Sequence, residues 1–124
     1  MEANSQVGTG RAREFVEARR HPRYKLKVDI RVYARNASVV RGHTVDLSQS
    51  GISVMLGVEI PVGEVVRLEF AVPMGDVECH ALVRQRCAFR YGLQFVESSA
   101  ELDVIRRTCG QLAMEQSLRE ARRS

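Results

Sequence analysis

Hydrophobic and polar residues alternate from residue 24 onward, with the period of two that is typical of strands. The segment YKLKVDIRVYA (24–34) carries a charged residue at most of the positions between its apolar ones. We therefore predict one half-buried strand over this segment, with one face toward a core and one toward water. The residues expected to face the core are Leu26, Val28, Ile30 and Val32.

Further short apolar runs follow at regular intervals, with turn residues between them and no helical segment until residue 98. The turn at 61–64 contains Gly63, where a positive φ is expected. This rhythm is typical of an antiparallel sandwich or a closed barrel, and closure leaves no unpaired strand edge. We expect five or six strands in all, the later ones lying within the segments 39–48, 52–57, 65–73, 77–89 and 90–97.

The C-terminal segment has the pattern of a helix. Ser98-x-x-Glu101 is a capping-box pattern, and apolar side chains then recur at helical spacing to Leu112. We predict a helix over about residues 98–120 that packs on the barrel. The polar residues 1–17 are expected to be a flexible N-terminal segment, and residues 18–124 one domain.

Composition limits the class of protein. With 124 residues, 44% hydrophobic, the chain has the length of one globular domain. It has no apolar run of about 18 residues and no secretory signal, so a cytoplasmic protein is expected. The three cysteines are widely spaced and are expected to be reduced, without a metal, because the spacing of Cys79, His80 and Cys87 matches no zinc pattern.

The positive charge is concentrated in the first third of the chain. The net charge is +4, yet residues 11–41 hold ten Lys and Arg against three acidic residues. Such a field favours a partner that carries phosphate.

Two short motifs carry candidate chemistry. The first is Arg19-Arg20-His21-Pro22-Arg23, where Pro22 keeps the chain out of helical geometry. Guanidinium groups bind phosphate oxygens bidentately and stack on planar bases, whereas an ammonium group does neither well. Taken alone, an RxxxR pattern is more often a solvated basic surface.

The second motif is DLSQSG (46–51). Strand alternation predicts that Thr44, Asp46 and Ser48 share the outer face. An ionised carboxylate accepts hydrogen bonds and suits the parallel N–H donors of a guanine edge. Gly51 is expected where the backbone needs an unusual φ or a close approach by a ligand. A strand-ending turn that uses Asp and Ser locally explains the hexapeptide equally well.

Together, in this order and separation, the two motifs resemble the signatures RxxxR and [D/N]xSxxG of PilZ domains, bacterial receptors of cyclic di-GMP. YGLQFVE (91–97) also resembles a late strand of that family. The resemblance implies a six-stranded antiparallel β-barrel with a C-terminal helix, in which the arginine segment is a loop that wraps the ligand. It further implies that Arg19 and Arg23 bind phosphate and stack on guanine, with Arg20 a weaker candidate. Asp46 and Ser48 would read a guanine edge, and Gly51 would admit the nucleotide.

These observations favour a non-catalytic cyclic di-GMP receptor without a cofactor that signals to an unidentified protein partner. His43 and Asp46 have no Ser or Cys to complete a catalytic triad. Two alternatives stay open: a PilZ-like adaptor with weak or no nucleotide binding, and a basic barrel that binds nucleic acid, which the scarcity of aromatic residues makes less favourable. The pattern leaves open whether one nucleotide or two would bind. The remaining arginine cluster, expected in a solvated hairpin, is Arg84, Arg86 and Arg90.

Overall fold

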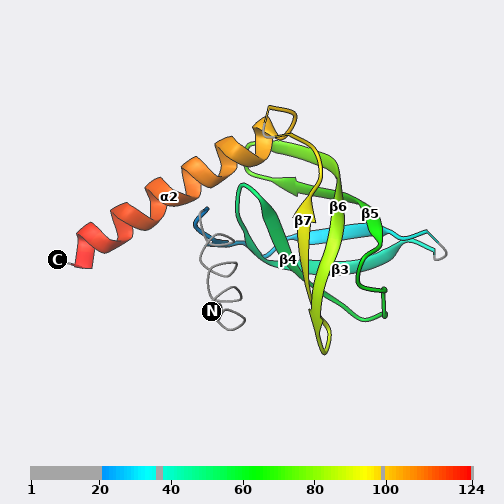
Figure 1. Ribbon diagram of the computed structural model, residues 1–124. Coiled ribbons are helices and arrows are strands. Elements are labelled where there is room, and N and C mark those ends of the chain that lie inside the picture. The colour runs from blue at the N-terminus through cyan, green and yellow to red at the C-terminus, as the bar shows by residue number, and fades with distance from the viewer. Residues whose placement is uncertain (1–20, 36–37, 99, 124) are drawn as a thin grey trace, which may run out of the picture.

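Seven strands and one long helix form the part of the chain that this computed structural model describes, residues 21–35, 38–98 and 100–123 (Figure 1). All strand pairs are antiparallel, and the order is β1-β3-β2-β5-β6-β7-β4, with β4 also paired to β3. That last pairing closes β2 to β7 into a six-stranded barrel, which confirms the predicted fold class. The elements are β1 (Tyr24–Lys25), β2 (Asp29–Tyr33), β3 (Val40–Leu47), β4 (Gly51–Leu56), β5 (Val65–Val72), β6 (Gly75–Cys87), β7 (Arg90–Phe95) and α2 (Asp103–Arg123).

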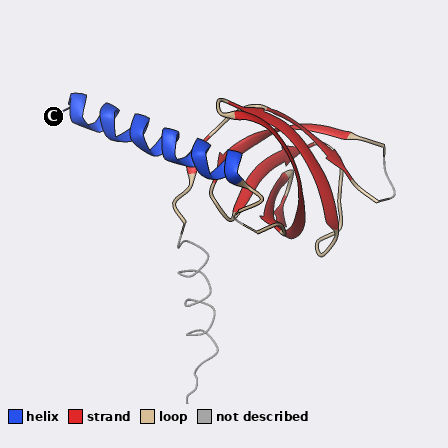
Figure 2. Cartoon of the chain, turned by 90° about the horizontal axis from the view of Figure 1, so that it is seen from above, coloured by secondary structure: helices blue, strands red, loops and turns tan. Residues whose placement is uncertain are grey.

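The core lies inside the barrel and is mostly aliphatic, with Phe70, Tyr91 and Phe95 as its aromatic residues. Alternate residues of each strand point inward, as the period of two requires. Figure 2 shows the strands curving around this interior, with α2 leaving one end of the barrel. Tyr91 is buried; its hydroxyl donates to the carbonyl of Val58 and accepts from the amide of Ile60. The largest fully buried aliphatic residues are Ile30, Leu47, Leu56, Leu68 and Ile105.

The segment predicted as one strand over 24–34 is two strands, β1 and β2. Between them, the side chain of Thr44 takes the place of backbone hydrogen bonds between strands. Its hydroxyl accepts from the amide of Val28 at 3.0 Å and donates to the carbonyl of Leu26. The register of β3 against β4 shifts between Thr44 and Asp46, which marks a β-bulge. The expected alternation across this stretch is therefore interrupted.

The same bulge contradicts the prediction that Thr44, Asp46 and Ser48 share the outer face. Thr44 points inward and is 1% exposed. A bulge adds one residue to a strand and so exchanges the faces of the residues beyond it. Asp46 thereby keeps a place on the outer surface, while the following Leu47 stays in the core at 0% exposure.

The C-terminal helix was predicted to begin near residue 98, but α2 begins at Asp103. The capping-box contacts do form: the amide of Ser98 donates to Oε1 of Glu101 at 3.0 Å, and the amide of Glu101 donates to Oγ of Ser98 at 3.4 Å. They stabilise a turn that precedes the helix. In the described part of the chain, no helix is both long and apolar enough to cross a membrane.

Removing the hydroxyl of Thr44 tests the account of the bulge. Thr44→Val leaves the amide of Val28 without its acceptor, so we expect the free energy of unfolding to fall by about 1–3 kcal/mol. Urea denaturation measures it, and Thr44→Ser, which retains the hydroxyl, is the control. Unchanged stability in Thr44→Val would show that this hydroxyl does not hold the junction.

Candidate ligand-binding site on the outer face of the barrel

Two residues from the separate sequence motifs meet on the outer surface. Arg23 lies just before β1, and Asp46 lies near the end of β3, where Lys25 of β1 pairs with it. Nη1 of Arg23 is 3.9 Å from Oδ1 of Asp46 and donates to Oγ of Ser53 at 3.5 Å. The other arginines of this motif, Arg19 and Arg20, lie outside the described residues.

A second arginine, which the sequence analysis expected in a solvated hairpin, also binds Asp46. Nη2 of Arg90, at the start of β7, donates to Oδ2 of Asp46 at 3.2 Å. The carboxylate is thus bracketed by two guanidinium groups, each about half exposed, while the Asp46 side chain is only 16% exposed. This contact joins residues 44 positions apart, so the local sequence around Arg90 gave no signal for it.

Ser48 uses its hydroxyl within the turn between β3 and β4. Its Oγ accepts from the amide of Gly51 at 3.0 Å and from the amide of Ser50 at 3.2 Å, and Ser48 as a whole is 5% exposed. These contacts are those of a serine-stabilised turn. In this structure Ser48 shapes the turn that holds Asp46 and Gly51 in place, and its role toward a ligand stays a prediction.

A glycine is needed at position 51 because the backbone of the neighbouring strand lies close to it. Its φ is not in the positive range, which among the described glycines only Gly63 and Gly75 occupy. A Cβ at residue 51 would lie 2.4 Å from the carbonyl oxygen of Leu93 in β7, far inside contact distance. The unusual φ expected as one alternative is therefore wrong, and the neighbouring strand explains the need for glycine, while a close approach by a ligand stays a prediction.

Short side chains form a strip of outer surface beside Asp46. Asp46 is in register with Ser53, and Ser53 with Gly92, across β3, β4 and β7. Ser53 is only 4% exposed and accepts from Arg23, and a Cβ at Gly92 would lie 3.0 Å from Cγ of Gln85, so longer side chains already lie over these small residues. On the far side of the strip, Arg84 donates to Oε1 of Gln94 at 2.8 Å. The strip thus lies between arginines on both sides, a surface suited to phosphate oxygens.

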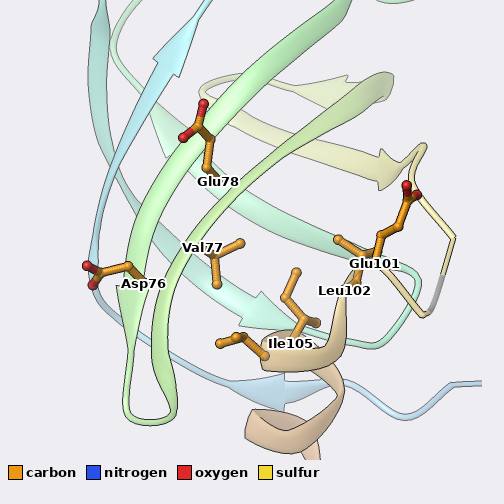
Figure 3. Close-up of a pocket in the computed structure, with 7 residues that line it drawn as sticks. Asp76, Val77, Glu78, Glu101, Leu102 and Ile105 are labelled. Carbon is orange, nitrogen blue, oxygen red and sulfur yellow. The ribbon is translucent and has the colours of Figure 1, made fainter.

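A hollow at the foot of α2 has the opposite electrostatic character. It encloses about 80 Å³ and lies between β6 and the first turn of the helix. Figure 3 shows Val77, Leu102 and Ile105 gathered there, with the carboxylates of Asp76, Glu78 and Glu101 around them. Three carboxylates repel phosphate, so this hollow is unsuited to an anionic ligand.

Among the described residues, no group of three or more His, Cys, Asp or Glu is placed to hold a metal. Cys79 is buried and His80 is exposed, on opposite faces of β6 as expected. Burial raises the pKa of the Cys79 thiol to about 12 and that of Cys109 to about 11. Both thiols are therefore protonated, and weakly nucleophilic, near neutral pH.

Gly51→Ala tests whether backbone packing sets this glycine. The added methyl group meets the carbonyl of Leu93, so we expect the free energy of unfolding to fall by about 1–3 kcal/mol, as overpacking does elsewhere. Gly57→Ala is the matched control, because a Cβ there meets nothing within 4 Å; it is expected to be neutral or stabilising. Equal stabilities for the two variants would contradict the packing account.

Comparison with known proteins shows the family to which this chain belongs. No curated protein matches significantly, but residues 17–111 match the family model of the PilZ domain. The fold is similar to the PilZ domain with c-di-GMP of YcgR from Escherichia coli (TM-score 0.66, 16% identity, covering 83% of this chain and 97% of that one).

Two further structures share the fold. One is the Bacillus subtilis inhibitor of motility MotI/DgrA (TM-score 0.64, 20% identity, covering 78% of this chain and 52% of that one). The other is the PilZ domain of CeSA from a cellulose-synthesizing bacterium (TM-score 0.58, 19% identity, covering 72% of this chain and 96% of that one). At these identities the structural likeness establishes the fold, and the family model covers most of the chain. The chain therefore belongs to the PilZ domain family.

Proposed function

We propose that this chain is a non-catalytic receptor for cyclic di-GMP, which binds on the outer strip formed by β3, β4 and β7. The observation that carries the proposal is the Asp46 carboxylate, fixed beside a row of small residues and flanked by Arg23 and Arg90. Membership of the PilZ family, in which the YcgR domain was solved with c-di-GMP, supports the choice of ligand.

The chemistry of each side chain fits a guanine dinucleotide. Asp46 accepts the paired N–H donors of a guanine Watson–Crick edge. Arg23 and Arg19 hold phosphate oxygens and stack on the bases, and Arg20 adds to the positive field. Ser48 and Gly51 contribute by setting the turn that carries Asp46 into the strip.

The ion pairs seen at Asp46 do not prevent this role. Both arginines are about half exposed, and exposed ion pairs are typically worth only about 0.2–1 kcal/mol. A dinucleotide brings two phosphates for the guanidinium groups and donors for the carboxylate. On binding, the ion pairs of Arg23 and Arg90 with Asp46 can therefore be replaced, at little cost in free energy, by contacts of the arginines with phosphate and of Asp46 with guanine.

Binding would order the arginine segment over the barrel and change the surface offered to a protein partner. The free energy of ligand binding offsets the entropy lost in fixing that segment. A protein partner would then recognise the reorganised surface or α2, since a binding module without catalysis acts through direct contact with its partner.

A second candidate is an adaptor that binds protein partners with little nucleotide affinity. One observation favours it: the polar groups of both Asp46 and Ser48 already have partners within the protein. The two candidates differ in one measurable property, the affinity for cyclic di-GMP.

Calorimetric titration with cyclic di-GMP, using GTP as the control at about 150 mM salt, tests the proposal. We expect saturable heat with cyclic di-GMP alone, and the stoichiometry will distinguish one nucleotide from two. Arg23→Ala and Asp46→Ala should abolish binding without unfolding the barrel. Arg90→Ala should weaken it roughly 10-fold or more, as loss of a charge-assisted contact does.

Arg67→Ala is the matched control, because Arg67 pairs with Glu69 and Glu78 on β5 and β6 rather than with Asp46. Full affinity in both Arg23→Ala and Asp46→Ala would overturn the assignment of the site. No heat from folded wild-type protein would overturn the receptor and leave the adaptor. Heat that falls steeply with salt and shows no preference for guanine would indicate a general polyanion binder.

A further inference from the structure

The hairpin between β6 and β7 projects beyond the rest of the barrel. Strand β5 is in register with β6 no further than Leu82, and β4 is in register with β7 no further than Arg90. Residues 84–90, which form the end of this hairpin, are all exposed. Figure 1 shows the hairpin extending from the barrel on the side away from α2. Its tip is therefore presented to solvent and contributes nothing to the core.

The turn at the tip holds Phe89 in an exposed position. Cys87 pairs with Arg90, so only Ala88 and Phe89 form the turn. Ala88 has a φ of 56°, in the left-handed region that is unfavourable for a residue with a Cβ. The carbonyl of Phe89 accepts from the amide of Leu56 at 2.9 Å, which ties the turn to β4, yet Phe89 remains 58% exposed. Strained backbone that keeps a phenyl ring in solvent is typical of a functional contact rather than of packing.

The loop between β4 and β5, residues 57–64, adds apolar side chains beside this tip. The hydroxyl of Tyr91, just after the tip, donates to the carbonyl of Val58, so the loop lies against the hairpin. Val58 and Val62 are both more than half exposed. We call residues 57–64 and 84–90 together the distal surface. Exposed apolar side chains that gather in one place on a folded protein mark a contact surface.

Arginines border these apolar side chains. Residues 84–90 contain three arginines and no acidic residue. Arg35 lies next to the loop, because its amide donates to Oε2 of Glu64 at 2.8 Å. The other carboxylate of the distal surface, that of Glu59, pairs with Arg86. Four arginines thus stand against two carboxylates that already have partners, which leaves an excess of two positive charges.

This combination has the chemistry of a surface that enters the headgroup region of an anionic membrane. Apolar side chains at projecting turns reach the boundary between headgroups and acyl chains. Guanidinium groups beside them bind headgroup phosphates bidentately, and the negative surface potential attracts them. A protein segment is more often bound in a groove or along a strand edge, whereas the apolar groups here stand at the tip of a hairpin.

We propose that the distal surface binds membranes that contain anionic lipid. Phe89 inserts at the headgroup boundary with Val58 and Val62 beside it, and the arginines contact headgroup phosphates. Gly75, at the opposite end of β6 from this hairpin, lies next to Val104 of α2. The bound barrel therefore holds α2 away from the membrane, where other partners can reach it. The proposal does not depend on cyclic di-GMP binding.

Sedimentation of the full-length protein with lipid vesicles, without nucleotide, tests this binding. We expect the protein to partition into phosphatidylcholine vesicles containing about one third phosphatidylglycerol roughly 10-fold more strongly than into pure phosphatidylcholine. Phe89→Ala should weaken the partitioning about 10-fold, because the inserted ring is lost. Met114→Ala is the matched control, since Met114 is an apolar residue on α2 that is 66% exposed, and it should bind as the wild type does.

Three outcomes would overturn the proposal. Equal partitioning into the two kinds of vesicle would remove the anionic lipid, and equal losses in Phe89→Ala and Met114→Ala would remove the distal surface. No partitioning of the folded wild type would exclude the membrane and leave an acidic protein partner as the occupant.

The contribution of charge has its own matched pair. Arg86→Ala should weaken partitioning about fivefold, because each arginine near an anionic surface contributes to the attraction. Arg106→Ala, which removes an arginine of α2 that likewise pairs with a carboxylate, should have little effect. Equal losses in the two variants would show attraction by net charge alone and contradict a contact at the distal surface.

Tryptophan fluorescence locates the contact directly, because the chain contains no tryptophan. In Phe89→Trp, the single indole should shift its emission to the blue and become shielded from acrylamide when anionic vesicles are added. In Met114→Trp, the emission should stay unchanged. A shift in Met114→Trp without one in Phe89→Trp would place the contact on α2 and overturn the proposal.

Discussion

Closure of the barrel by the pairing of β4 with both β3 and β7 is the constraint on which the site depends. It sets Asp46, Ser53 and Gly92 in one row and brings Arg90 to a carboxylate 44 residues earlier in the chain. Gly51 permits this closure, because only a residue without a Cβ lets β7 approach β4 so closely there. The residue that the sequence suggested as an entrance for a ligand therefore acts first on the fold, and through the fold on the site.

The electrostatic arrangement follows from the same topology. Arginines from two distant parts of the chain, Arg23 before β1 and the pair Arg84 and Arg90 in the β6–β7 hairpin, border the strip of small residues, while carboxylates surround the hollow at the foot of α2. An anionic ligand is thus directed to one surface and repelled from the other. Helix α2 contacts β6 beside this hollow and also β1, the first strand after the arginine motif.

The sequence predicted the barrel well because apolar and polar residues alternate along the strands and residues typical of turns stand between them. It failed where local contacts outweighed the pattern: the hydroxyl of Thr44 divides the first strand, and the bulge after Thr44 exchanges the faces that follow. Arg23 and Asp46 were identifiable because their motifs are local. The role of Arg90 was not, since it depends on which strand closes the barrel, and periodicity carries no information on strand order.

The most direct test of the account is to map the backbone amide signals of the ¹⁵N-labelled protein during titration with cyclic di-GMP. The amides of Ser53 and Gly92, on the strip, should shift with saturation, while those of Glu69 and Ala71 on β5 should stay in place. Shifts confined to β5 and the hollow beside α2 would contradict the placement of the ligand. An unchanged spectrum of the folded protein would contradict the receptor itself.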